Sequence, residues 1–432
     1  MNFEMKEQKN IITPKNFLER GVAEIIVKNE FLQLLKDKKQ APLRLKMGFD
    51  PSTPDLHLGH AVGLRKLKQL QNMGHKVIVI VGDWTAQIGD PSGRSATRPM
   101  LTAEQVKSNA ETYLSQFFKI VNEEQTEVRL QSDWFGKFTL ADVIKLTSKF
   151  TVAQFLARDD FSKRFSENQP ITITELLYPL LQAYDSVEIN SDIEFGGTDQ
   201  KFNLLVGREL QGMMGYKQQQ CLLVPILPGT DGMKKMSKSL NNHIALSETP
   251  TEMFKKIMRI PDFAKEEKNT SREIYNDSIY IDGQKSMILL YLELLTDTSQ
   301  KDLLEINQAI KSKTINPIEI KKLLAKKIIA EIHDGNQAML AEKNFRNIVQ
   351  DRIIPDDIKI CDLSNVTNIS SISLQKFLLE IKMANSASEA KRLISQKAVK
   401  LDGNILNSSF KPSTIKSGNI IRVGRKLMIK FR

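Results

Sequence analysis

The chain has 432 residues, 41% of them hydrophobic and 26% charged, an ordinary composition for a globular protein of roughly two to four domains. It contains no apolar run near the ~20 residues of a membrane-spanning helix and no signal-peptide pattern, so we expect a cytoplasmic protein without a membrane partner. Its two cysteines, Cys221 and Cys361, are far apart and outside any CxxC motif, so we expect neither a disulfide framework nor a structural metal.

The charge is unevenly distributed along the chain. The whole sequence has a formal net charge of +11. Residues 371–432 contain 13 basic and three acidic residues, a net charge of +10, so the rest of the chain is nearly neutral. A near-neutral body with a basic tail predicts that the tail contacts a polyanion, although a solvated basic face has the same composition.

A β–α–β unit is predicted near the start of the chain. Residues 43–49 (LRLKMGF) alternate apolar and polar side chains, which predicts a strand. Residues 57–73 have apolar side chains at helical spacing, and Gly74 follows as a helix stop. The β-branched run at 76–83 (KVIVIVGD) predicts a buried strand. The fold class is therefore α/β, with a parallel sheet and covering helices.

The remaining chain predicts three further parts. Residues 100–195 are expected to be mostly helical, and residues 221–227 (CLLVPIL) to form a short strand. Lysine-rich amphipathic segments after residue 247 indicate a separate helical domain. We expect an α/β domain at 1–245, an α-helical domain at 246–345, a linker at 346–365 and a small C-terminal α/β domain at 366–432.

Two histidines stand where the first predicted strand passes into a helix, in the stretch DPSTPDLHLGH. His57 and His60 are three residues apart and share one face of the helix start. The free N–H groups there favour an anion, and Ser52 and Thr53 add hydroxyls. A metal site would need a third ligand, which the nearby sequence lacks. A phosphate site is favoured over a pair of buried structural histidines.

A basic loop, PGTDGMKKMSKSLNNHI, follows the strand predicted at 221–227. Its KKMSKS core runs from Lys234 to Ser239 beside glycines. Lysine ammonium groups act as point charges on phosphate oxygens, and a mobile loop can deliver them to a nucleotide. A lysine-rich surface loop is the ordinary explanation, so this motif gains weight from its occurrence together with the histidine pair.

One predicted helix has a polar stripe. In YPLLQAYD, Tyr178, Gln182 and Asp185 are spaced by four and three residues and so lie on one face. They are either the polar edge of an amphipathic helix or the lining of a pocket. The combination of a phenol, an amide and a carboxylate favours the pocket.

The basic tail has a pattern of its own. The segment SASEAKRLI predicts a helix capped by Ser386 or Ser388, followed by strands around a DG turn. This arrangement resembles the small RNA-binding domain first described in ribosomal small-subunit protein four. The resemblance implies RNA contacts from Lys391, Arg392, Lys397 and Lys400, which suit recognition of structured RNA by shape and phosphate.

Taken together, HLGH and KMSKS resemble the two signature motifs of class I aminoacyl-tRNA synthetases. The stripe YPLLQAYD, the segment GGTDQ (196–200) and the turn GDPSGRS (89–95) resemble the tyrosyl-tRNA synthetases, specifically the bacterial type with a KMSKS loop. The resemblance covers nearly the whole chain. It implies a Rossmann-like catalytic domain, an anticodon-side helical domain and the C-terminal RNA-binding domain.

The resemblance also implies site residues for L-tyrosine. Tyr178, Gln182 and Asp90 hold the α-amino group. Asp185 accepts a hydrogen bond from the phenol, and Gln200 lies near the carboxylate. At a position where some members have a tyrosine that also contacts the phenol, this chain has Lys46, so that second contact is in question and Lys46 is treated as adjacent to the pocket.

For ATP, the resemblance implies phosphate contacts and a ribose contact. The catalytic set is His57, His60, Lys235 and Lys238. Asp199 lies near the ribose. The further residues implied at or near the nucleotide are Asp50, Ser52, Thr53, Ser237, Ser239, Arg94 and Arg98. Mg²⁺ accompanies ATP and is held mainly by phosphates and water.

The implied activity is that of a tyrosine–tRNA ligase acting on tyrosine, ATP and tRNA(Tyr). The substrate carboxylate is ionised at neutral pH, so adenylate formation needs no general base, only positioning and charge stabilisation. The resemblance also implies a homodimer, with a contact expected from a helix around 140–160. Two alternatives are a tryptophanyl enzyme, which shares both motifs, and an RNA-binding protein descended from a synthetase.

Overall fold

The computed structural model describes residues 17–18, 20–37, 42–52, 55–91, 102–265, 277–347, 359–363, 366, 369, 371–424 and 427–432. These residues belong to two compact units, Met1–Glu342 and Lys343–Arg432. Each unit is described by itself below. Within the described ranges, none of the helices combines the length and the apolar character needed to cross a bilayer.

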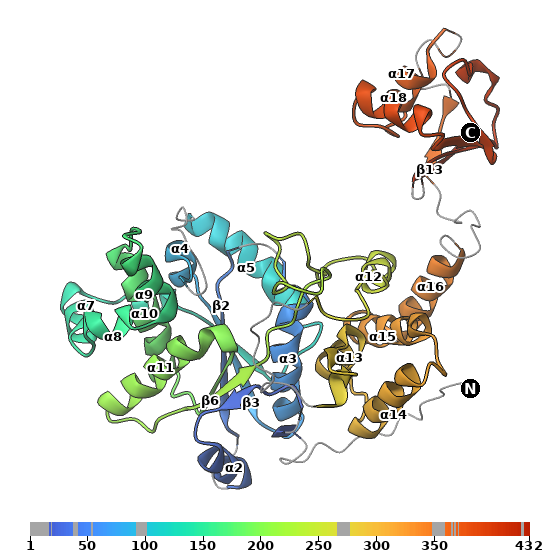
Figure 1. Ribbon diagram of the computed structural model, residues 1–432. Helices are drawn as coiled ribbons and strands as arrows, with labels where there is room; N and C mark the ends of the chain where they lie inside the picture. Colours follow the sequence, from blue (N-terminus) through green and yellow to red (C-terminus); the bar gives the residue numbers. More distant parts are fainter. Residues whose placement is uncertain are drawn as a thin grey trace. The chain divides into compact units, whose positions relative to one another are not determined.

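The first unit is built on a six-stranded sheet (Figure 1). Its strand order is β1-β6-β5-β2-β3-β4, and the only antiparallel pair among these strands is β1 with β6. The β-branched runs fill the sheet centre, because buried parallel strands need apolar side chains on both faces. The strands are β1 (Glu24–Ile25), β2 (Arg44–Phe49), β3 (Lys76–Val81), β4 (Thr126–Leu130), β5 (Ile193–Gly197) and β6 (Gln220–Val224).

Helices cover both faces of this sheet. The predicted β–α–β unit is confirmed as β2, α3 and β3, with α3 packed on one face and α11 packed against β5 and β6. The helices of this part are α2 (Lys28–Lys36), α3 (Leu58–Gln71), α4 (Thr85–Ile88), α5 (Ala103–Phe117), α6 (Ser132–Phe135), α7 (Leu140–Thr147), α8 (Val152–Leu156), α9 (Asp159–Ser166), α10 (Ile173–Glu188), η2 (Thr198–Gln200) and α11 (Lys201–Met213).

The order of the strands places a crevice at one edge of the sheet. From β2 the chain proceeds to β3 and β4 on one side, whereas β5 and β6 lie on the other side. The carboxyl ends of β2 and β5 therefore lie at a topological switch point, where open parallel sheets bind their ligands.

The segment expected to be mostly helical differs from the prediction in two places. The strand β4 was missed, because its sequence TEVRL is charged and short, as edge strands often are. The single helix expected around 140–160 is wrong as well. Thr139 and Thr151 each begin a new helix with a capping box, so α7 and α8 are separate.

A group of helices follows the basic loop and packs beside α3, mainly through α13. Arg65 of α3 is buried there and forms ion pairs with Asp297 and Glu331. The helical group and the sheet belong to one compact unit, and the expected division at 245/246 stays a prediction. The elements are α12 (Pro250–Ile257), η4 (Asp277–Ile279), β7 (Tyr280–Ile281), β8 (Gln284–Lys285), α13 (Met287–Leu295), α14 (Gln300–Lys311), α15 (Pro317–Ile332) and α16 (Gly335–Phe345).

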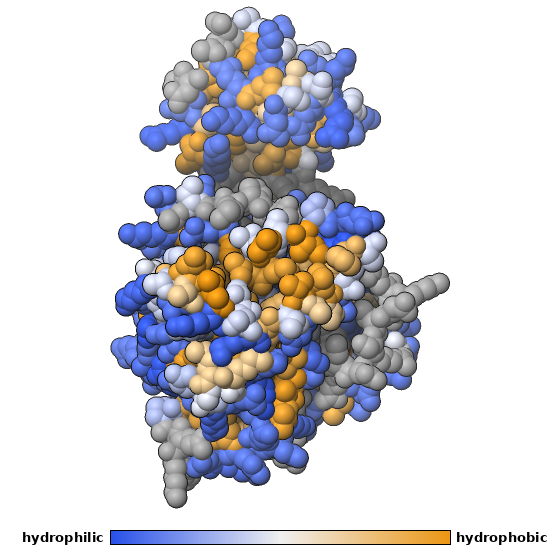
Figure 2. Space-filling model, turned by 90° about the vertical axis from the view of Figure 1, so that its left-hand side faces the viewer, coloured by the Kyte–Doolittle hydropathy of each residue, from blue (hydrophilic) through white to orange (hydrophobic). Residues whose placement is uncertain are grey.

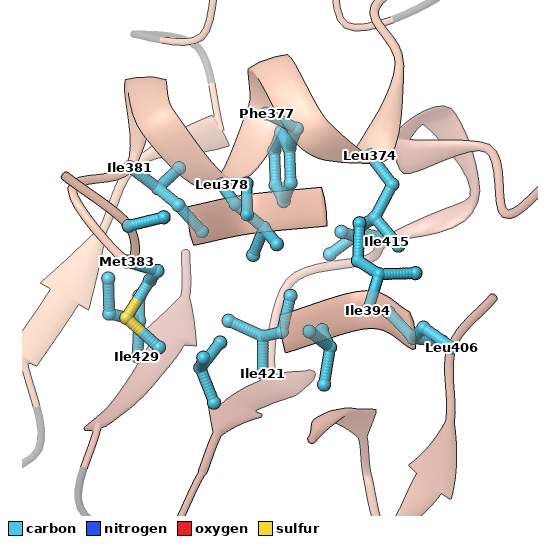
Figure 3. Packing of buried hydrophobic residues seen from close by; sticks show 14 of the residues in the cluster. Leu374, Phe377, Leu378, Ile381, Met383, Ile394, Leu406, Ile415, Ile421 and Ile429 are labelled. Carbon is cyan, nitrogen blue, oxygen red and sulfur yellow. The ribbon is translucent and has the colours of Figure 1, made fainter. Parts of the chain in front are cut away.

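The second unit has two helices over a five-stranded sheet. Apolar side chains of both helices meet those of the strands in one core, which includes Phe377, Ile394 and Ile421 (Figure 3). Ser386 caps the second helix, as one of the two predicted alternatives. The elements are β9 (Lys359–Cys361), α17 (Leu374–Glu380), α18 (Ala387–Ser395), β10 (Val399–Leu401), β11 (Asn404–Ile405), η7 (Pro412–Thr414), β12 (Ile420–Val423) and β13 (Leu427–Phe431).

One strand of this sheet comes from the segment expected to be a linker. β9 pairs in parallel with β13, so the stretch 346–365 is not connection throughout. The short sequence KIC has little periodicity, and only its pairing with a distant strand makes it regular structure.

Candidate active site

A cavity of about 380 Å³ lies at the carboxyl ends of the parallel strands. It is lined by residues from the ends of β2, β5 and β6, from the start of α3, from the middle and C-terminal half of α10, and from the basic loop. It brings together most of the residues singled out from sequence, namely Asp50, Ser52, His57, His60, Asp90, Tyr178, Gln182, Asp185, Asp199, Gln200, Lys235 and Ser237. Lys238 and Ser239 continue the same loop, whereas Thr53, Arg94 and Arg98 lie outside the described residues.

The two histidines form the first turn of α3. His57 is its N-cap, and its Nδ1 accepts a hydrogen bond from the Gly59 N–H at 3.2 Å. The Nδ1 of His60 accepts from the His57 N–H, also at 3.2 Å. A neutral imidazole whose Nδ1 accepts must hold its proton on Nε2. Both rings therefore have an Nε2–H donor that is not used in the helix cap.

The electrostatic surroundings keep both rings neutral. Burial lowers the pKa of His57, and the neighbouring His60, His243, Lys238 and Lys235 lower it further. Burial is also the main cause that lowers the pKa of His60, to about 4, with Lys238 contributing. At neutral pH these rings are uncharged hydrogen-bond donors beside an open helix N-terminus, a combination suited to an anion.

The basic loop returns to the histidines. Leu58 N–H donates to the Ile244 carbonyl at 3.0 Å, and Leu246 N–H donates to the Leu56 carbonyl at 2.9 Å. At the loop entrance, the buried Tyr291 of α13 donates its hydroxyl to the Pro228 carbonyl at 2.6 Å. The chain at HLGH is thus hydrogen-bonded through its backbone to the segment that follows KMSKS, and Tyr291 of the helical group holds the start of the loop.

The lysines of this loop are paired with carboxylates of the cavity rim. Lys235 Nζ lies 3.2 Å from Asp199 Oδ2, and Lys238 Nζ lies 3.4 Å from Asp55 Oδ2. Ser237 and Ser239 share a hydrogen bond of 2.8 Å between their hydroxyls. Because these ion pairs are partly exposed, each is worth only about 0–1 kcal/mol. An anionic ligand in the cavity can therefore replace the carboxylates.

Deeper in the cavity, polar side chains hold one another in place. Asp50 accepts hydrogen bonds from Tyr178 Oη at 2.8 Å and from Thr85 Oγ1 at 2.6 Å. Gln200 Nε2 donates to Asp90 Oδ2 at 2.7 Å. The predicted polar stripe on α10 therefore faces the cavity, as the pocket alternative required.

Asp185 is a buried carboxylate with one oxygen available. Its side chain is 2% exposed, and Oδ2 accepts from Gln131 Nε2 at 2.9 Å. Within the described residues, Oδ1 has no hydrogen-bond partner. Burial raises the pKa of Asp185 to about 7, against the opposing effects of Lys46 and Gln131. A buried acceptor without a donor is costly, so this atom is suited to a ligand that donates a hydrogen bond.

Lys46 does not line the cavity. Its ammonium group points between β2, β5 and α10, where it contacts the backbone carbonyl of Gln182 and the side chains of Ser186 and Glu194. This lysine is therefore engaged behind the cavity wall. The residue that donates a hydrogen bond to Asp185 is Gln131.

Several residues of the site were missed at the level of sequence. Thr85 and Gln131 follow β3 and β4, and Asp55 pairs with Lys238. Asn242 links the two sides of the basic loop, donating to the Lys235 carbonyl and to Asp231. Polar residues directly after predicted strands were the available signal for Thr85, while β4 itself was not predicted.

In the second unit, the four basic residues singled out from sequence are all exposed. Lys391 and Arg392 lie on α18, Lys397 follows that helix, and Lys400 lies on β10. We refer to these four exposed residues as the basic surface of that unit.

Comparison with known proteins identifies the class. The family model for class I tRNA synthetases of the tryptophan and tyrosine type matches residues 38–350, and the S4 domain model matches residues 373–414. A tyrosyl-tRNA synthetase from Archaeoglobus fulgidus, solved with L-tyrosine, has a TM-score of 0.56 at 24% identity and covers 75% of this chain and 98% of its own. That likeness shows the same fold. The chain belongs to the class I tRNA synthetases of this family.

More similar relatives specify the branch. A tyrosine–tRNA ligase of Dehalococcoides mccartyi strain CBDB1 is 50% identical over 98% of this chain and 98% of its own. The ligase of Thermotoga maritima is 46% identical over 95% of this chain and 94% of its own. The sequence falls among the tyrosine–tRNA ligases, and the membership inferred from HLGH, KMSKS and the α10 stripe is confirmed.

Proposed function

We propose that the cavity activates L-tyrosine with ATP to form tyrosyl-adenylate and pyrophosphate, and then transfers tyrosine to the 3′ end of tRNA(Tyr). The observation that carries this proposal is the buried Oδ1 of Asp185, an acceptor without a donor among the described residues, at the inner end of a cavity that also holds HLGH and KMSKS residues. A ligand with a phenol at one end and a reacting carboxylate at the other suits this arrangement.

Tyrosine is proposed to bind with its phenol donating to Asp185. Asp90, Tyr178 and Gln182 then surround the α-amino group, and Gln200 lies near the carboxylate. Phenylalanine in the same position leaves the Asp185 oxygen unpaired. The cost of this unpaired acceptor is how tyrosyl enzymes in general discriminate against phenylalanine. The hydrogen bond from Gln131 supports this role, because it orients the carboxylate.

ATP is proposed to bind across the start of α3. The Nε2–H groups of His57 and His60 donate to phosphate oxygens, and Lys235 and Lys238 exchange their carboxylate partners for the β- and γ-phosphates. Asp199, released from Lys235, is then available to the ribose, with Asp50, Ser237 and Ser239 nearby. Mg²⁺ is proposed to accompany ATP, held mainly by the phosphates and water, where it would neutralise phosphate charge.

The chemistry follows from this placement. The carboxylate of tyrosine attacks the α-phosphorus in line with the departing pyrophosphate. No base is needed, since the nucleophile is already ionised. The neutral histidines donate to oxygens that gain charge in the transition state, and the two lysines stabilise the leaving group. Holding the reactants together supplies the rest of the rate gain.

The test is tyrosine-dependent exchange of pyrophosphate into ATP, followed by charging of tRNA(Tyr). Exchange with tyrosine but not with tryptophan is expected. Exchange with tryptophan alone would make the substrate assignment wrong, and tRNA binding without any exchange would favour the RNA-binding alternative.

The C-terminal unit is proposed to bind tRNA through its basic surface. The double variant Lys391→Glu/Arg392→Glu is expected to raise the KM for tRNA roughly tenfold and to flatten its salt dependence, since each lost phosphate contact removes about one unit of slope. Tyrosine activation without tRNA should not change. The matched control, Lys411→Glu/Lys416→Glu, makes the same charge change elsewhere in the unit. An equal loss in both double variants would mean that net charge, and not α18, is responsible.

The chain is further proposed to form a homodimer in the cytoplasm, where its substrates occur. Five large apolar side chains on or near α7 to α10 are exposed, namely Leu140 (75%), Ile144 (58%), Val152 (61%), Phe165 (65%) and Ile173 (79%). Figure 2 looks onto this side of the molecule and shows apolar residues gathered there. A second copy is the occupant that the family resemblance implies, and exposed patches of this kind mark protein interfaces.

Charges introduced into this surface should separate the copies. The variant Leu140→Glu/Ile144→Glu is expected to sediment as a monomer at micromolar concentration, because buried unpaired carboxylates oppose association. The control Leu304→Glu changes an exposed leucine of α14, which is 47% exposed, and should leave the sedimentation unchanged. A dimer that persists in the double variant would place the contact elsewhere.

A further inference from the structure

A buried ion pair lies directly behind the cavity, in the seam between β2 and β5. Lys46 and Glu194 are opposite each other in the parallel register, and their side chains are 0% and 1% exposed. Lys46 Nζ lies 2.9 Å from Glu194 Oε1. Neither residue lines the cavity. The role of this pair is not explained by direct contact with a ligand.

The hydrogen bonds around this pair have only one possible direction. The ammonium group can only donate, and it donates to Glu194, to the backbone carbonyl of Gln182 at 2.7 Å and to Ser186 Oγ at 2.7 Å. Ser186 therefore donates its own hydroxyl proton to Glu194 Oε2, 3.1 Å away, which also accepts from Gln219. Lys46, Ser186 and Gln219 therefore all donate to the Glu194 oxygens, which only accept hydrogen bonds.

Gln182 connects this network to the cavity. Its Nε2 donates to Glu194 Oε1 at 3.1 Å, and the residue lines the cavity wall. An amide can rotate to exchange its oxygen and nitrogen, and the surrounding network decides which orientation is adopted. Because Glu194 can only accept, the NH₂ group must face it. The amide oxygen is then the atom left for a ligand.

We propose that the Lys46–Glu194 pair is a positioning device that holds the Gln182 amide with its oxygen towards the ligand, and so selects a substrate with an ammonium group at that place. This inference rests on the proposed function, in which Gln182 contacts the α-amino group of tyrosine. It adds two specificity-determining residues, Lys46 and Glu194, that never touch the substrate.

Stability alone is a weak reason for such a pair. Buried ion pairs can often be replaced by apolar residues of similar volume with little or no loss of stability. Removing only one partner has a different effect. Without Lys46, the buried Glu194 loses the charged donor that helps to fix its oxygens as acceptors. The Gln182 amide is then no longer held in one orientation, and it can turn to present NH₂ to the ammonium group of the ligand.

The experiment compares two ligands that both contain the phenol. Tyramine has the ammonium group but no carboxylate, and 3-(4-hydroxyphenyl)propionate has the carboxylate but no ammonium group. Both contact Asp185 through the phenol, so any change at Asp185 affects them equally. Binding of each ligand and of L-tyrosine is measured by calorimetry on the full chain, for wild type and for Lys46→Met.

Lys46→Met is expected to weaken tyramine and L-tyrosine roughly ten- to thirty-fold, while the propionate changes by less than about threefold. Lys46→Arg retains the charge and should preserve the preference for the amine. The matched control is Lys66→Met. Lys66 is another buried lysine, 4% exposed, bonded to the Phe17 and Arg20 carbonyls and away from the cavity. Lys66→Met should lower thermal stability without changing the ratio of the affinities for tyramine and the propionate.

If Lys46→Met does not fold, the double variant Lys46→Met/Glu194→Met replaces both charges with apolar side chains and leaves the Gln182 amide unpinned. It should lose the preference for the amine to a similar extent. An equal weakening of tyramine and the propionate, or none at all, in a folded variant overturns the inference. A wild-type chain that binds no tyrosine and catalyses no exchange would instead overturn the proposed function.

Discussion

Replacing Lys238 by alanine should lower the kcat of tyrosine activation roughly 10²–10³-fold, the usual loss when one preorganised group that stabilises transition-state charge is removed. The KM for tyrosine should hardly change, because Lys238 lies in the basic loop and pairs with Asp55 at the rim. Its ammonium group is already desolvated in part, and it needs only to exchange one carboxylate for phosphate. Pyrophosphate-exchange kinetics with varied ATP and varied tyrosine separate the two constants.

A neighbouring lysine supplies the control for this prediction. Lys234 belongs to the same loop, and its side chain is exposed. Lys234→Ala removes an equal charge without removing a group from the proposed phosphate contact, so kcat should stay within about threefold of wild type. Equal losses in the two variants would show that the loop acts through its net charge. Full activity in Lys238→Ala would remove this residue from the mechanism.

The second large effect is expected at Asp185. Asp185→Asn should lower kcat/KM for tyrosine roughly 10²–10³-fold and reduce the preference over phenylalanine, because the amide is a weaker acceptor for the phenol. Activation of phenylalanine should change little, since it has no hydroxyl to lose. Exchange assays with both amino acids give the ratio. An unchanged ratio would contradict the assignment of Asp185 to the phenol.

The same variant has a distinct signature in stability. The folded-state pKa of Asp185, about 7, is above the ordinary aspartate value of 3.8. The folded protein therefore binds more protons than the unfolded chain between about pH 4 and 7, and Asp185 makes the free energy of unfolding fall as pH rises through this window. The asparagine of the variant does not titrate and has no such dependence. Asp185→Asn should therefore unfold at higher temperature than wild type above pH 7, by about 2–4 °C for each kcal/mol gained.

The difference in melting temperature between wild type and Asp185→Asn separates the contribution of Asp185 from that of the histidines. The effect of His60 on the pH dependence of stability has the opposite sign. Its pKa is lowered from 6.5 to about 4, so the free energy of unfolding rises with pH in that range. This contribution is present in both proteins and cancels. Thermal melts of wild type and variant from pH 4 to pH 8 provide the comparison. A melting difference that does not vary with pH would mean that Asp185 is ionised throughout.

Much of the site was predictable, because its residues occur in contiguous motifs. His57 and His60 are adjacent on the first turn of α3 for a local reason, the three-residue spacing at a helix start. Tyr178, Gln182 and Asp185 share a face of α10 for the same kind of reason. The strands β2 and β3 were predicted from periodicity, whereas β4 and β9 are regular only through pairing with distant partners.

The sequence alone was therefore sufficient for the α/β class, for the residues of HLGH, KMSKS and the α10 stripe, and for the family. Only the tertiary structure decided what those residues contact. Within the described residues, it paired Lys235 with Asp199 and Lys238 with Asp55, left one oxygen of Asp185 without a donor, and turned Lys46 away from the cavity towards Glu194. The physical reason is that local spacing sets which side chains share a face. Burial and charge pairing depend instead on the order of strands in the sheet, which brings together residues as far apart in the chain as 46 and 194.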